Sequence, residues 1–240
     1  MTQAYELIES LKYTFNVHEM FKMNVASVPV AKAKEFAAKV FDEAGKDIDK
    51  ELPDFEKNYM MVQKATKAAP DIPRIEMPVI EPHNIDQFEK DIKAGRIDIF
   101  KPFAFKGQQF PTDLLGNAEK SAEFLSLGQK DGKESDDRLK AKIEMIPAKS
   151  LKPTQSQIWL EKLATNIAKF GKPKAGSSVT NATIIVSKNN YLLDGHHRWS
   201  QALLADPKLK IRALKVPLDI DTLLKMGRSY GNAVGNAQKQ

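Results

Sequence analysis

Short apolar runs alternate along this chain with longer stretches that carry apolar residues at helical spacing, and this pattern predicts an α+β protein. The clearest amphipathic helix covers residues 30–44, with Gly45 near its C-terminal cap. The same spacing predicts helices at 3–12, 52–62, 84–95, 112–127 and 155–170, and a last helix that begins at Asp219. Short apolar runs predict strands at 97–100, 140–146, 183–186, 191–193 and 211–216.

Composition shifts along the chain predict how it is divided. Residues 129–137 are rich in Gly, Ser, Asp and Lys, which is typical of a linker. Four prolines between residues 68 and 82 exclude a long helix there and predict an extended connection. We therefore expect a mostly helical accessory region at 1–128, a linker at 129–137, a second domain at 138–228 and a flexible tail at 229–240. The accessory region would serve interaction or homo-oligomerisation.

The net charge of +6 conceals an asymmetry between the two halves. Residues 138–240 hold 18 Lys and Arg against 6 Asp and Glu, a net charge of +12, which leaves −6 for residues 1–137. A strongly basic module attracts phosphates, whether they belong to a nucleotide or to a nucleic acid. The basic half is therefore the expected binding half.

Several classes of protein are excluded by composition. The chain has no run of 18 apolar residues, so we expect no transmembrane helix and no membrane partner. Its first residues lack the pattern of a secretory signal, and it contains no cysteine for disulfide or thiolate chemistry. These features predict a cytoplasmic location.

The main candidate site is the sequence Asp194-Gly195-His196-His197-Arg198, between a predicted strand and a predicted helix. Asp194 stands where a helix N-cap is expected, and the first turn of a helix attracts anions through its unpaired N–H groups. Arg198 adds a planar donor group suited to phosphate, and His196 and His197 add groups that titrate near neutrality. The residues together predict an anion site with acid/base capacity, although Asp194 alone could be only a cap and Arg198 only a solvated charge.

Residues 140–225 resemble the ParB/sulfiredoxin superfamily, whose members bind nucleotide phosphates at a similar turn. The resemblance is carried by the order strand, turn, strand and Asp-Gly-His-His-Arg motif, by the strand at 142–146 and by the loop at 151–155. The motif is most similar to the ParB-like nuclease and free serine kinase branches. The resemblance implies a C-terminal domain with a small mixed sheet and flanking helices, preceded by a mostly helical N-terminal region.

Two departures from that family narrow the function. Sulfiredoxins use a cysteine in this turn, and the absence of cysteine excludes sulfinic-acid reduction. Free serine kinases place a carboxylate base in the loop that corresponds to residues 153–155, where the nearest side chains here are the amides of Gln155 and Gln157. An amide cannot accept the substrate proton. Thr154 and Gln157 also have the spacing of a helix capping box.

The expected activity is nucleotide-dependent phosphoryl transfer or hydrolysis, with ATP or another nucleotide and Mg²⁺. His196 is the candidate general acid/base, and Asp194 would bind Mg²⁺ or orient the nucleophile. The residues expected to contact phosphate are Gly195, His197 and Arg198, with Thr154, Gln155, Lys152 and Lys174 as further contacts. Two alternatives stay open: a metal-dependent ParB-like nuclease acting on DNA, and a non-catalytic, nucleotide-gated DNA-binding or scaffold protein.

Overall fold

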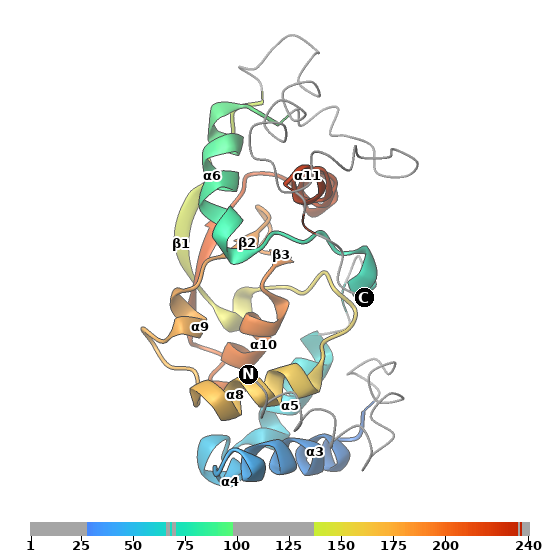
Figure 1. Cartoon of the computed structure of the whole chain (residues 1–240), viewed down its shortest axis with the longest axis vertical. Helices are drawn as coiled ribbons and strands as arrows, with labels where there is room; N and C mark the ends of the chain where they lie inside the picture. Colours follow the sequence, from blue (N-terminus) through green and yellow to red (C-terminus); the bar gives the residue numbers. More distant parts are fainter. Residues whose placement is uncertain (1–27, 66–67, 69–70, 98–136, 235, 237–240) are drawn as a thin grey trace.

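The computed structural model describes residues 28–65, 68, 71–97, 137–234 and 236, which form eight α-helices and one four-stranded sheet (Figure 1). The α+β class expected from the sequence is confirmed. The α-helices are α3 (Val30–Glu43), α4 (Ile48–Glu51), α5 (Phe55–Ala65), α6 (Ile85–Ala94), α8 (Leu160–Phe170), α9 (Ser178–Asn181), α10 (His196–Ala205) and α11 (Ile220–Ala233). The 3₁₀ turns are η2 (Arg74–Glu76), η3 (Pro82–Asn84) and η5 (Ala148–Ser150), and the strands are β1 (Lys142–Pro147), β2 (Ile184–Val186), β3 (Leu192–Asp194) and β4 (Lys210–Lys215).

The sheet is mixed, with the strand order β1-β4-β2-β3. β2 runs parallel to β4 and antiparallel to β3, and β1 runs antiparallel to β4. All three residues of β2 are fully buried, as expected for a short apolar run at the centre of a sheet that is covered on both faces. β2 and β3 form the predicted hairpin, whose turn contains Asn190 at a φ of 64°.

Helices cover both faces of the sheet (Figure 1). Neighbouring strand residues point to opposite sides, so they pack against different helices. Ile184 and Leu192 belong to an apolar cluster with α3, α5, α8 and α10, whereas Ile185 and Leu193 belong to a second cluster with α6, α11 and residues 77–80. Helices α3, α5 and α6 precede the predicted linker, and they share these clusters with the motif-bearing half of the chain.

Local periodicity located many of these elements correctly. The predicted helix at 30–44 is α3, and the predicted hairpin strands are β2 and β3. Asp219 precedes α11, and its carboxylate accepts a hydrogen bond from the backbone N–H of Thr222 at 2.9 Å. The predictions at 3–12, 98–100, 112–127 and 129–136 lie outside the described residues.

Two boundaries differ from the sequence prediction. The helix expected at 155–170 begins only at Leu160, and its N-cap is Trp159, so Thr154 and Gln157 form no capping box. Residues before Leu160 pair instead with other backbone segments, since Ser156 N donates to Ile72 O at 2.9 Å. At the C-terminal end, α11 continues to Ala233, so residues 229–233 of the predicted flexible tail are helical.

Over the described part of the chain, every helix is too short or too polar to cross a lipid bilayer.

Candidate functional site

The turn between β3 and α10 is built around Gly195. Its φ is 95°, and a Cβ at this position would lie 2.8 Å from Cβ of Ile184 and closer still to Cγ2 of the same side chain. Both the backbone conformation and the close approach therefore require glycine. Gly195 is also the N-cap of α10, whereas Asp194 is the last residue of β3, so the prediction that Asp194 caps the helix is wrong. Within the described residues no side chain caps α10, which leaves its first N–H groups open to a ligand.

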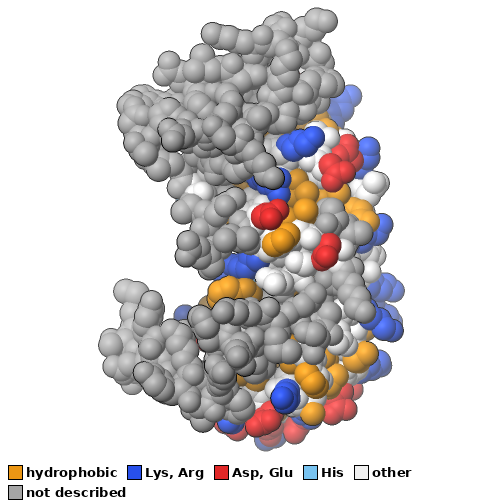
Figure 2. Space-filling model, turned by 90° about the vertical axis from the view of Figure 1, so that its right-hand side faces the viewer, with side chains coloured by type: hydrophobic (Ala, Val, Ile, Leu, Met, Phe, Trp, Pro, Cys, Tyr) orange, Lys and Arg blue, Asp and Glu red, His pale blue; other side chains and the backbone are white. Residues whose placement is uncertain are grey.

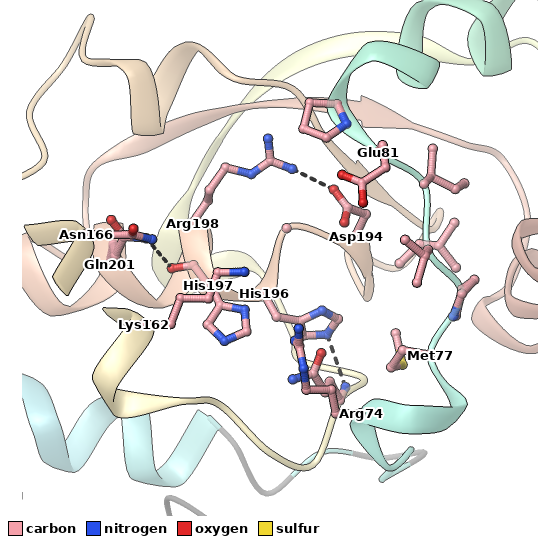
Figure 3. A pocket seen from close by; sticks show the side chains of 17 residues that line it. Arg74, Met77, Glu81, Lys162, Asn166, Asp194, His196, His197, Arg198 and Gln201 are labelled. Atoms are coloured by element: carbon pink, nitrogen blue, oxygen red, sulfur yellow. Dashed lines mark hydrogen bonds and ion pairs between the residues drawn. The ribbon is translucent and has the colours of Figure 1, made fainter. Parts of the chain in front are cut away.

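A pocket of about 270 Å³ opens at this turn (Figure 3). It brings together segments that are distant in the sequence, because η2 and the residues after it, α8 and the start of α10 all contribute side chains. The lining residues are Arg74, Met77, Pro78, Val79, Ile80, Glu81, Pro82, Gln155, Lys162, Asn166, Leu193, Asp194, Gly195, His196, His197, Arg198 and Gln201. Four of the five motif residues thus present charged or imidazole side chains to one cavity, and Gly195 lines it as well.

The wall formed by residues 77–81 belongs to no helix or strand and is held in place by α11 and by Asn236, which follows it. Arg228 Nε donates to the carbonyl of Glu76 at 3.0 Å, and Asn236 Nδ2 donates to the carbonyl of Val79 at 3.0 Å. Gly231 lies so close that a Cβ on it would be 2.5 Å from the Val79 carbonyl oxygen. The position of this wall therefore depends on the C-terminal helix.

Arg198 forms an ion pair across the first turn of α10. Its Nη2 lies 2.6 Å from Oδ2 of Asp194, and the two side chains are 19% and 25% exposed. Burial raises the pKa of Asp194, and the positive charge of Arg198 opposes that shift. The ion pair orients the guanidinium beside the helix N-terminus, where its remaining N–H groups can bind an anion. Glu81 lies beside Asp194 in Figure 3, and its charge contributes to the raised pKa of Asp194.

His196 is a positioning residue in this structure. Its side chain is buried, and Nε2 accepts hydrogen bonds from the backbone N–H groups of Thr154 and Gln155, each at 3.1 Å. Burial, helped by the charge of Arg74, lowers the pKa of His196 to about 3. The ring is therefore neutral at physiological pH and carries its proton on Nδ1. This geometry does not fit the general acid/base role expected from the sequence, because the basic nitrogen is already occupied.

His197 makes a similar contact with the same loop. Its Nε2 accepts a hydrogen bond from the backbone N–H of Trp159 at 3.3 Å. Burial lowers the pKa of His197 well below its usual value, with smaller contributions from Arg74 and Lys162. The histidine pair thus fixes residues 154–159 against α10. His197 also lines the pocket, so contact with a ligand through its other ring atoms stays a prediction.

Arg74 is one of several pocket residues that the sequence did not predict. It lies on η2, in the proline-rich stretch that was predicted to be only a connection. Its guanidinium carbon is 5.2 Å from the centroid of the Trp159 ring, and its Nε is buried with no hydrogen-bond acceptor among the described residues. Burial lowers the pKa of Arg74, and the charge of Asp194 opposes this effect. A lone arginine between prolines gave no local signal of this placement.

Three further polar residues reach the pocket from helix faces. Lys162 and Asn166 are one turn apart on α8, and Gln201 follows the motif by one turn on α10 (Figure 3). Gln201 Nε2 donates to the carbonyl of His197 at 3.1 Å. The spacing of Lys162 and Asn166 is the signal that could have identified them, since residues four apart share one helix face.

Of the four remaining residues that were expected to contact phosphate, only Gln155 lines the pocket. Its side-chain amide donates to the carbonyl of Gln157. Thr154 is buried and does not line the pocket, and its backbone N–H donates a hydrogen bond to Nε2 of His196. Lys152 and Lys174 are exposed and do not line the pocket, and Lys152 Nζ lies 5.0 Å from the centroid of the Tyr191 ring. The structure therefore does not bring these two lysines to the site.

The pocket combines three cationic side chains with two carboxylates and an uncapped helix N-terminus. The cations are Arg74, Lys162 and Arg198, the carboxylates are Asp194 and Glu81, and both imidazoles are neutral. No group of three or more His, Asp or Glu side chains that could hold a metal occurs within the described ranges. The chain matches no protein-family model, no curated protein and no solved structure.

Proposed function

We propose that the pocket binds a nucleoside phosphate, with a phosphoryl group at the first turn of α10, and that the protein transfers or hydrolyses that group. The observation that carries the proposal is the convergence of Arg74, Lys162 and Arg198, from three separate elements, on an uncapped helix N-terminus. Cations and backbone N–H groups are the partners that phosphate oxygens require. A ParB/sulfiredoxin-like arrangement of the motif-bearing half would agree with this use of the turn.

The opposite wall of the pocket suits the nucleoside. Met77, Pro78 and Val79 line it together with Leu193, and they offer an apolar surface to a base or a ribose. A volume of about 270 Å³ is at the lower end for small-molecule sites, so the phosphates would fill the pocket while the nucleoside extends toward its mouth.

Mg²⁺ fits the acidic side of the same pocket. Mg²⁺ is commonly bound by one or two carboxylates together with substrate phosphates, and Asp194 and Glu81 are the two carboxylates that line the cavity. When bound, the ion would neutralise charge on the phosphate oxygens. These two carboxylates are also the pocket groups that can accept a proton from a water molecule or a hydroxyl, because the acceptor nitrogens of both histidines already have partners.

A second candidate is a protein that binds nucleotide without chemistry, as a gate for a scaffold or DNA-binding role. The engagement of both imidazoles with backbone N–H groups favours this candidate, because it removes the most common acid/base residues from catalysis. The DNA nuclease finds less support. On the face in Figure 2, basic, acidic and apolar side chains are interspersed over the described surface, so this face presents no continuous basic area to the phosphates of duplex DNA.

Calorimetric titration of AMP, ADP and ATP, with and without Mg²⁺, tests the proposal. We expect binding by the wild type and a loss of at least tenfold in Arg198→Ala, which corresponds to about 1.4 kcal/mol. Arg138→Ala is the matched control, because Arg138 is exposed and lies outside the pocket. Absence of binding to every nucleotide would refute the proposal. Product formation from ATP would distinguish the enzyme from the gate, and metal-dependent nicking of a plasmid that requires Arg198 would select the nuclease.

A further inference from the structure

Arg74 is a half-buried cation whose hydrogen bonding is incomplete among the described residues. Its Nε is buried and has no acceptor among the described residues, and no ion pair to its guanidinium occurs there. Burying a donor without a partner is unfavourable, so such a group in a pocket indicates a ligand atom that completes it. Arg74 lines the same cavity as the helix N-terminus and Arg198, which places that ligand atom in the proposed phosphate site.

Two contacts position Arg74 without neutralising it. The guanidinium lies over the Trp159 ring, with 5.2 Å between its central carbon and the ring centroid. The chain just before it is paired with the loop that docks on His196, because Ile72 N donates to the carbonyl of Thr154 at 2.9 Å. The aromatic face and the backbone pairing therefore fix the guanidinium before a ligand arrives, which lowers the entropic cost of binding.

The carboxylates of the pocket do not balance Arg74 as they balance Arg198. Asp194 lies 2.6 Å from Arg198 in a direct ion pair, whereas its charge acts on Arg74 without a direct ion pair among the described residues. The neutral rings of His196 and His197, which accept backbone hydrogen bonds, offer no compensating negative charge. The cavity thus holds two guanidiniums on separate elements, one paired and oriented on α10 and one without a bonded counter-ion in the described structure on η2.

We propose that the site selects ligands with at least two phosphoryl groups, one bound by Arg198 and the first turn of α10 and the next bound by Arg74. The inference rests on the function proposed above and adds the class of ligand and the residue that determines it. Each guanidinium presents a planar set of donors that matches one phosphoryl group, and both arginines line the same cavity of about 270 Å³. A monophosphate could satisfy one of them and would leave the other unpaired.

Calorimetric comparison of AMP with ADP, and of inorganic phosphate with pyrophosphate, measures this selection. We expect the wild type to bind ADP and pyrophosphate at least about tenfold more tightly than their monophosphate counterparts, because the second phosphoryl group gains charge-assisted hydrogen bonds. Arg74→Ala should remove that preference and leave AMP affinity within about threefold of wild type. Arg138→Ala should keep the wild-type affinities for AMP and ADP, since it removes an exposed arginine that lies outside the pocket.

Thermal unfolding of the same variants separates loss of a ligand contact from loss of the fold. Arg74→Ala removes a half-buried cation that has no bonded counter-ion among the described residues, so its unfolding midpoint without ligand should equal or exceed that of the wild type. If Arg74→Ala fails to fold, Arg74→Lys is decisive, because it keeps the charge and loses the planar donors, and it should reduce the preference. Equal losses of AMP and ADP affinity in the Arg74 variant, or no preference in the wild type, would overturn the inference while leaving nucleotide binding intact. Failure of all four ligands to bind the wild type would refute the proposed function as well.

Discussion

Replacement of Gly195 by alanine should destabilise the protein by about 2–5 kcal/mol. The backbone at φ 95° costs a residue with a Cβ about 1–2 kcal/mol. The new Cβ would also lie 2.8 Å from Cβ of Ile184, and overpacking of a filled core costs about 1–3 kcal/mol. The two effects add because one concerns the backbone and the other the neighbouring strand. The same change would displace the first turn of α10 and should weaken nucleotide binding.

Urea unfolding of Gly195→Ala beside Gly176→Ala isolates the contribution of the close approach. Gly176 has a φ of 80° and no atom within 4 Å of the position of a Cβ, so its replacement carries the backbone cost alone, about 1–2 kcal/mol. Shortening the neighbouring side chain in the double variant Gly195→Ala/Ile184→Ala should relieve part of the overpacking. The double variant should then lose less unfolding free energy than the sum of the losses in the two single variants. Equal destabilisation in Gly195→Ala and Gly176→Ala would refute the proposed packing of this turn.

Two further predictions concern the residues that position the pocket. Burial holds the pKa of His196 at about 3, below its usual 6.5, so between these values the folded state binds fewer protons than the unfolded state. The stability of the protein should therefore fall as the pH drops from about 6.5 toward 3. This ring contributes at most about 1.4 kcal/mol per pH unit to that fall. His196→Gln keeps an acceptor and removes the titration, so its unfolding free energy should depend less steeply on pH; an unchanged slope would contradict this. Gly231→Ala would displace the Val79 carbonyl, whose oxygen lies 2.5 Å from the position of the added Cβ. Its nucleotide affinity, compared with that of Gly176→Ala, should fall although residue 231 does not contact the ligand. An unchanged affinity would show that α11 does not position the wall at residues 77–81.

The elements that depend on local pattern could be predicted from the sequence. Apolar runs and helical spacing predict β2, β3, β4 and α10. The motif turn between β3 and α10 can also be predicted, because it depends on residues that are adjacent in the sequence. Asp194 was misplaced as a cap because its pairing with Ile185 extends β3 by one residue, which periodicity alone cannot show. The late start of α8 has a similar cause, since the residues before it pair with Ile72 instead of coiling.

The chemistry of the site depends on contacts between distant segments, and those contacts are invisible in the sequence. Arg74 enters the pocket because Ile72 pairs with the loop at 154–156, about eighty residues away. The same loop occupies Nε2 of His196, and this changes an expected acid/base group into a hydrogen-bond acceptor for the backbone. A motif can therefore indicate where an anion binds, while the roles of its side chains depend on what packs against them.

The most direct test of the anion site is the response of individual backbone amides to a ligand. Two-dimensional nitrogen–proton spectra of the labelled protein, recorded during titration with ADP, report each N–H separately. The account predicts that the largest shifts occur at residues 195–198, in the first turn of α10, and that they disappear in Arg198→Ala. Shifts that leave residues 195–198 unchanged and cluster instead around the exposed Lys152 or Lys174 would contradict it.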